Sequence, residues 1–137
     1  MNVIAFRPRE FKAAEARAAE LPHRRNYDNP TDARIGSPLG LAAIRGLISK
    51  EEFDAASSWG AVHSNYLETI KNPDAFTDAW CERSVAQYQR GLDVLERHPK
   101  RVFHAVMALA AYGEDWGDLE YTVNCAKIAL REMPQKY

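Results

Sequence analysis

Residues 37–70 read SPLGLAAIRGLISKEEFDAASSWGAVHSNYLETI, and this stretch decides the fold class. Ser37 followed by Pro38 is typical of a helix start, because serine caps free N–H groups and proline suits the first helical position. Gly46 suits the left-handed conformation in which many helices end. The sequence therefore predicts a short helix that ends at Arg45.

A second helix is predicted directly after the first. Ser49 and Glu52 have the S-x-x-E spacing of a capping box, in which each residue satisfies a backbone N–H of the other. From Lys50 onwards, apolar residues recur every three or four positions, which places them along one side of a helix. These residues are Phe53, Ala56, Trp59, Val62, Tyr66, Leu67 and Ile70.

Three more helices are predicted downstream, over residues 74–97, 99–112 and 119–133. Asn72 and Pro73 repeat the cap-then-proline signal before the first of these. The apolar side of that helix is supplied by Phe76, Ala79, Trp80, Val85, Tyr88, Leu92 and Leu95. The helix after it is apolar nearly all round, which is typical of a central, buried helix. Because no stretch alternates with period two, we expect an all-α fold, a compact bundle of about five helices.

The first 36 residues differ from the rest of the chain. Residues 10–21 favour a helix, but its apolar content is mostly alanine, so burial would anchor it weakly. Turn-forming residues are dense over residues 22–37, which predicts an irregular linker. We therefore divide the chain into a basic N-terminal arm with a weak helix and a linker (1–36) and a helical domain (37–137).

Charge is also unevenly distributed. Residues 1–50 carry nine basic and five acidic residues, a net charge of +4, whereas residues 51–137 have a net charge of −5. A basic leading segment can mark an arm that meets phosphate, although its glutamates equally suit a solvated tail. The arm arginines are Arg7, Arg9, Arg24, Arg25 and Arg34.

The whole composition suits one soluble domain. The chain has 137 residues, of which 46% are hydrophobic and 27% charged, as in ordinary globular proteins. A net charge of −1 argues against a protein held to nucleic acid by bulk charge alone. The chain has no apolar run long enough to span a membrane, and its start has no secretory signal pattern. We therefore expect a cytoplasmic protein without a membrane contact.

The spacing of reactive residues predicts neither a catalytic nor a metal site. His63 has no carboxylate at metal-ligand spacing and is expected to be a partly buried structural residue. We expect His98 near a helix end, His104 facing outward, and Cys81 and Cys125 as small buried hydrophobic residues. No glycine-rich loop follows a strand, so no phosphate cradle is predicted. We expect a protein that is not an enzyme and holds no cofactor or metal.

Two stretches have features of a helix-turn-helix. Residues 42–46 have the A-x-x-x-G spacing of its turn, but Glu52 then stands where an apolar residue is needed, which favours a plain helical hairpin. Residues 92–133 follow the order of a sigma-factor region 4, with a scaffold helix, a glycine turn and a closing helix. We therefore expect a degenerate helix-turn-helix-like C-terminal half.

Residues 45–55 read RGLISKEEFDA. This stretch resembles the R-G-x-I-S-x-E-x-x-x-A hairpin of small helical regulators from alphaproteobacterial prophages and gene transfer agents. In those proteins the hairpin precedes a long helix and a degenerate region-4-like tail, and here the resemblance covers residues 38–133. It implies a role in switching on late or transfer-agent genes through DNA and RNA polymerase.

The first functional interpretation is therefore a phage-type transcription regulator. It would act with RNA polymerase or a sigma factor, as a late-gene or gene-transfer-agent activator or as an antiterminator. Arginines in a basic arm suit phosphate or minor-groove contacts that form on binding DNA. The residues expected to contact DNA are the five arm arginines together with Lys127 and Arg131 of the last helix.

The second interpretation is a non-enzymatic adaptor or inhibitor that binds a host protein without DNA. Trp116 and Tyr121, at the acidic turn of residues 114–118, would be the anchors of that interface. The alternative for both side chains is packing in the core. A homo-oligomer is also considered, since the predicted helix over residues 10–21 needs a surface to pack against.

Overall fold

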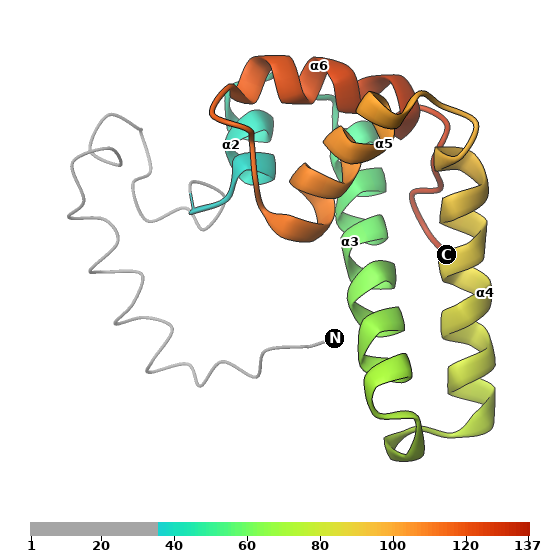
Figure 1. Cartoon of the computed structure of the whole chain (residues 1–137). Coiled ribbons are helices and arrows are strands. Elements are labelled where there is room, and N and C mark those ends of the chain that lie inside the picture. Colours follow the sequence, from blue (N-terminus) through green and yellow to red (C-terminus); the bar gives the residue numbers. More distant parts are fainter. Residues whose placement is uncertain (1–35) are drawn as a thin grey trace, which may run out of the picture.

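The structure, a computed structural model, describes residues 36–137 (Figure 1). This part of the chain contains five α-helices and no strand, so the all-α expectation is confirmed. The helices are α2 (Pro38–Ile44), α3 (Lys50–Lys71), α4 (Asp78–Leu95), α5 (Lys100–Met107) and α6 (Leu119–Leu130). Between them lie the 3-10 turn η3 (Pro73–Ala75) and the π turn η4 (Ala108–Tyr112). The helix predicted over residues 10–21 lies outside the described residues.

The first two helices begin where their caps predict. The Ser49 hydroxyl accepts a hydrogen bond from the Glu52 N–H at 3.1 Å, and the Ser49 N–H donates to the Glu52 carboxylate at 2.7 Å. The Ser37 hydroxyl likewise accepts from the Gly40 N–H at 3.0 Å. Gly46 has the expected left-handed backbone, with φ of +69°. Local signals therefore determine how this part of the chain folds.

The long helix α4 begins later than expected. Asn72 and Pro73 start only the turn η3, after which Phe76 is extended. The Thr77 hydroxyl then accepts a hydrogen bond from the Trp80 N–H at 3.1 Å, so Thr77 is the cap of α4. The predicted start at residue 74 is wrong because a second cap follows the first. The predicted ends at residues 97 and 133 also extend too far, by two and three residues. The single helix predicted over residues 99–112 is instead α5 followed by η4.

The helices form a body and a protruding hairpin. α3 and α4 pack against each other in antiparallel directions, while α2, α5 and α6 surround the first half of α3 (Figure 1). α5 packs mainly against α6. The helix-turn-helix-like character expected of this α5–α6 half stays a prediction. The far half of the hairpin extends beyond the body and consists of two helices only.

Trp59 lies where the hairpin meets the body and is fully buried. Its Nε1 donates to Sδ of Met107 at 3.3 Å, and its ring stacks on Tyr88 with centroids 5.4 Å apart. Gly91 of α4 faces the same indole, and a Cβ at this position would lie 2.2 Å from Cζ3 of Trp59. The two helices approach closely here because residue 91 has no side chain.

The last residues of the chain return along the hairpin. The ring centroids of Tyr137 and Trp59 lie 6.4 Å apart. The Arg90 guanidinium lies 5.7 Å from the centroid of the Tyr137 ring. Gln87 Nε2 donates to the Tyr137 carbonyl at 3.3 Å. Burial raises the pKa of Tyr137 to about 12, against the opposing effect of the Arg90 charge. This tail therefore closes the core beside Trp59.

Candidate interaction surface

Two of the residues expected to contact nucleic acid lie on α6 and are engaged with Glu52. Arg131 Nε donates to Glu52 Oε2 at 3.1 Å. Lys127 is half-buried, and its charge also favours the ionised form of Glu52. Both bases therefore contribute to holding α6 against the start of α3. The five arm arginines lie outside the described residues.

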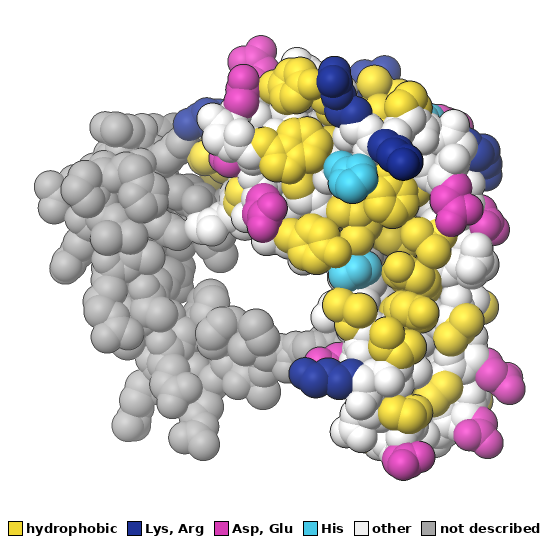
Figure 2. Space-filling view, viewed as in Figure 1, with side chains coloured by type: hydrophobic (Ala, Val, Ile, Leu, Met, Phe, Trp, Pro, Cys, Tyr) yellow, Lys and Arg dark blue, Asp and Glu magenta, His cyan; other side chains and the backbone are white. Residues whose placement is uncertain are grey.

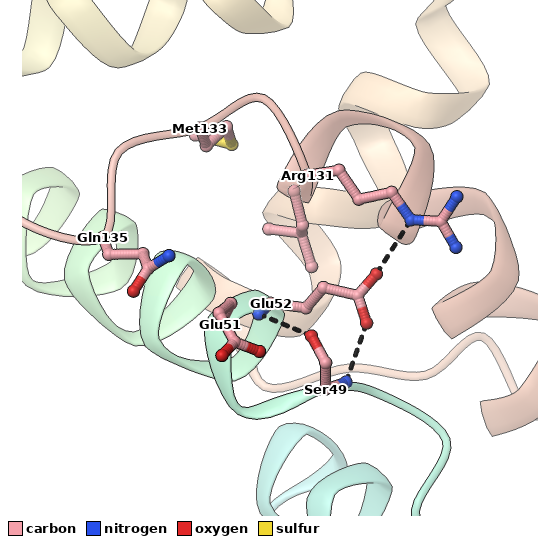
Figure 3. A pocket seen from close by; sticks show the side chains of 7 residues that line it. Ser49, Glu51, Glu52, Arg131, Met133 and Gln135 are labelled. Atoms are coloured by element: carbon pink, nitrogen blue, oxygen red, sulfur yellow. Dashed lines mark hydrogen bonds and ion pairs between the residues drawn. The ribbon is translucent and has the colours of Figure 1, made fainter.

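Glu52 is a buried carboxylate whose charge is stabilised by hydrogen bonds from Ser49 and Arg131. Burial by itself raises its pKa, but the hydrogen bonds from Ser49 and Arg131 outweigh this effect, so the pKa is lowered overall. Figure 3 shows the carboxylate between the Ser49 backbone and the Arg131 guanidinium. The sequence identifies Glu52 as part of the capping box and as a residue that conflicts with a helix-turn-helix, but not as a partner of α6. In the structure it joins the first turn of α3 to the end of α6.

A cavity of about 340 Å³ lies beside this ion pair (Figure 3). Its walls come from the start of α3, the end of α6 and the tail: Ser49, Glu51, Glu52, Leu130, Arg131, Met133 and Gln135. The carboxylate and guanidinium at its centre bond to each other. This arrangement explains how the helices pack and does not point to a particular ligand.

The predicted anchors Trp116 and Tyr121 are both on the surface. Each is 44% exposed, and their ring centroids lie 6.5 Å apart. Packing in the core, the alternative for these two residues, is therefore wrong. Trp116 adopts a left-handed backbone conformation with φ of +56°, which is uncommon for an aromatic residue.

The turn that carries these rings is held by its own carboxylates. Asp115 Oδ1 accepts a hydrogen bond from the Gly117 N–H at 2.9 Å, and Asp118 Oδ1 accepts one from the Tyr121 N–H at 3.0 Å. The second bond caps α6. The two aromatic rings are thus presented by an ordered turn, which reduces the conformational entropy lost on binding.

Other large apolar side chains are exposed along the hairpin. Leu67, Ile70 and Val85 are 46%, 55% and 48% exposed, although each belongs to the apolar side of its helix. Figure 2 shows hydrophobic side chains along the hairpin and up onto the body on one face of the molecule. The length of α3, at 22 residues, is the signal that predicts such exposure, because the shorter helices of the body cannot cover all of it.

The histidines and cysteines are dispersed. His63 was expected to be partly buried and is buried, with its ring 6.1 Å from Tyr88 and 5.8 Å from Tyr112, and burial lowers its pKa. His104 is exposed, as expected. Cys81 and Cys125 are half-buried rather than buried. Across residues 36–137, no group of three His, Cys, Asp or Glu side chains could hold a metal ion.

Comparison of the chain with protein-family models, curated proteins and solved structures finds no match. Among the helices of residues 36–137, none combines the length and the apolar character that a membrane crossing requires.

Proposed function

We propose that this chain is a regulator that works by binding a protein partner through the turn between η4 and α6. The observation that carries the proposal is a pair of exposed aromatic rings, Trp116 on the ordered turn and Tyr121 in the first turn of α6. Tryptophan and tyrosine are the residues most enriched among the energetic anchors of protein interfaces.

The charge around these rings indicates the kind of partner. Residues 114–120 contain Glu114, Asp115, Asp118 and Glu120 and no basic residue. Aromatic anchors surrounded by carboxylates fit a partner surface that is apolar at its centre and basic at its rim. We propose RNA polymerase or a sigma factor as this partner, because the resemblance of residues 38–133 to phage-type regulators implies one.

The test is to remove one ring without disturbing the turn. Trp116→Asn suits this purpose, because asparagine tolerates the left-handed conformation found at this position. We expect binding to purified RNA polymerase, or to the sigma factor, to weaken by at least about tenfold. Ile128→Asn on the exposed side of α6 is the matched control and should bind normally. Unchanged binding by Trp116→Asn, with helicity intact, would overturn the proposal.

Direct DNA contact is a second candidate, and one observation on the described part of the chain favours it. Arg97, Lys100 and Arg101 are exposed around the start of α5, His104 is exposed in its last turn, and no acidic residue occurs over residues 97–113. These bases outnumber the neighbouring carboxylate of Glu132, which pairs with His98. Such a surface suits phosphate and would act together with the basic arm.

Salt dependence tests this second candidate. Arg24→Ala with Arg25→Ala should weaken binding to duplex DNA of any sequence and flatten its dependence on salt, and Lys100→Ala with Arg101→Ala should do the same. Gln89→Ala on exposed α4 is the control. If the DNA affinity of a double variant depends on salt concentration as strongly as that of the wild-type chain, the two bases replaced in that variant do not contact DNA.

A further inference from the structure

The far half of the hairpin is packed in an unusual way. Its buried positions include small polar residues, Thr69 and Ser84, whereas the large apolar residues Leu67, Ile70 and Val85 point outward and are about half exposed. A helix pair that folds alone in water buries its large apolar residues and exposes its polar ones. The composition of this half therefore fits a hairpin that is covered from outside.

The outward residues lie on one side of the hairpin. The rings of Tyr66 and Tyr88 stack across the two helices, with centroids 3.8 Å apart and planes within 3° of parallel. Ile70 follows Tyr66 by one turn of α3, and Val85 precedes Tyr88 by one turn of α4, so both lie on the side of the stacked rings. We call the residues Tyr66, Leu67, Ile70, Val85 and Tyr88 the hairpin face.

The hairpin face continues onto the body of the molecule. His63 contacts Tyr88 on one side and Tyr112 on the other, and Tyr112 is 59% exposed. In Figure 2 the hydrophobic side chains follow the hairpin up to the body in the same way. The apolar surface therefore extends from the tip of the hairpin to η4.

The two ends of this surface carry opposite charges. At the tip, residues 68–83 carry four exposed carboxylates and two exposed bases, Lys71 and Arg83, so the tip is acidic with a net charge of −2. At the body, α5 begins with the exposed bases Lys100 and Arg101. A surface that is apolar along its length, acidic at one end and basic at the other is complementary to a copy of itself in the reverse direction.

We propose that two copies of this chain associate through the hairpin face in antiparallel directions, about a two-fold axis. The hairpins would form an antiparallel four-helix bundle, in which Ile70 and Val85 of one copy cover His63 and Tyr112 of the other. The acidic tip of each copy would lie against the start of α5 in its partner. This association is independent of the partner proposed above for Trp116 and Tyr121.

Sedimentation equilibrium of the full chain tests the association. We expect the wild-type chain to be a dimer, and Ile70→Glu and Leu67→Gln each to shift it towards the monomer. Both side chains are about half exposed, so these variants should keep their helicity. Ile128→Glu is the matched control, since Ile128 is 53% exposed but lies on α6 outside the hairpin face. A monomeric wild-type chain would overturn the proposal, and so would a dimer that only Ile128→Glu dissociates.

A charge exchange tests the antiparallel direction of the two hairpins. Glu82→Lys and Arg101→Glu should each weaken self-association when studied alone, because each places like charges together at both ends of the dimer. A mixture of the two variants should form a heterodimer, because every tip then meets an opposite charge. Failure of the mixture to associate more strongly than either variant would overturn the antiparallel arrangement.

Discussion

At the scale of single residues, the contact between Gly91 and Trp59 determines how closely the two long helices approach. Neither residue explains this contact alone. The indole fits only against a position without a side chain, and glycine provides that space although it lowers the helix propensity of α4. A glycine inside a helix is a weak signal in a sequence, because it can also mark a kink or an end. Its role becomes clear only when the residue opposite is known.

Replacement of this glycine gives a prediction with a definite sign. Gly91→Ala should destabilise the fold by about 1–3 kcal/mol, because the added Cβ would lie 2.2 Å from the Trp59 ring. Helix propensity alone predicts the opposite, a gain of about 0.5–1 kcal/mol. Urea unfolding followed by circular dichroism distinguishes the two, and a more stable variant would show that the indole moves aside without penalty.

The residues of the candidate surface were predictable in part. Trp116 and Tyr121 are recognised in the sequence as aromatic residues beside an acidic turn, although nothing local distinguishes an exposed pair from a buried one. The exposure of Leu67, Ile70 and Val85 was not predictable from periodicity, since spacing shows which residues share a side but not whether another element covers that side. The bond between Arg131 and Glu52 was not predictable, because the two residues are distant in the sequence.

At the scale of helices, the start of α3 depends on a capping box with a third participant. Glu52 binds the Ser49 N–H with one carboxylate oxygen and Arg131 with the other. The cap therefore orders the first turn of α3 and also positions the carboxylate that holds α6. The capping box was predictable from four consecutive residues, whereas its link to α6 was not.

Removal of the capping hydroxyl should have a measurable effect. Ser49→Ala deletes the acceptor for the Glu52 N–H and is expected to lower the free energy of unfolding by about 1 kcal/mol. Ser57→Ala, at an exposed position of the same helix, is the control and should change stability by less than about 0.5 kcal/mol. Thermal and urea unfolding of both variants would measure the difference. Equal stabilities would mean that water replaces the serine hydroxyl.

The start of α4 shows the limit of such local signals. Asn72-Pro73 and Thr77 are both reasonable helix caps, and the sequence alone does not show which of the two begins the α-helix. The structure uses both, the first for a 3-10 turn and the second for the α-helix. Reversal of the chain between two antiparallel helices needs several residues, and the second cap supplies the later start that this reversal requires.

At the scale of the whole molecule, the body and the hairpin meet around His63. Its ring contacts Tyr88 of α4 and Tyr112 of η4, so it touches both parts at once. The fold class was predictable because five helices with caps and breaks leave no other choice. The division into body and hairpin was not, since it depends on contacts between residues far apart in the chain.

This position of His63 predicts loss of stability in acid. Burial lowers its pKa in the folded chain, so the unfolded chain binds the proton more readily. The stabilisation that comes from keeping His63 neutral is fully present above its pKa in the unfolded chain, about 6.5. It is lost as the pH falls below that value. Free energies of unfolding at about pH 8 and about pH 5.5 should differ less in His63→Phe than in the wild-type chain. The control His104→Gln, at an exposed position, should show the same change in the free energy of unfolding between the two pH values as the wild-type chain. If His63→Phe also shows that full change, groups other than His63 cause the loss of stability.

The tail that packs beside Trp59 has a consequence for biosynthesis. Translation delivers α3 and α4 from the ribosome before Tyr137, which completes the covering of Trp59, has joined the chain. During that interval the Trp59 ring, the largest fully buried side chain of the described core, lacks one of its aromatic neighbours. The growing chain can therefore form its helices early, but it reaches its final core only once residue 137 has emerged.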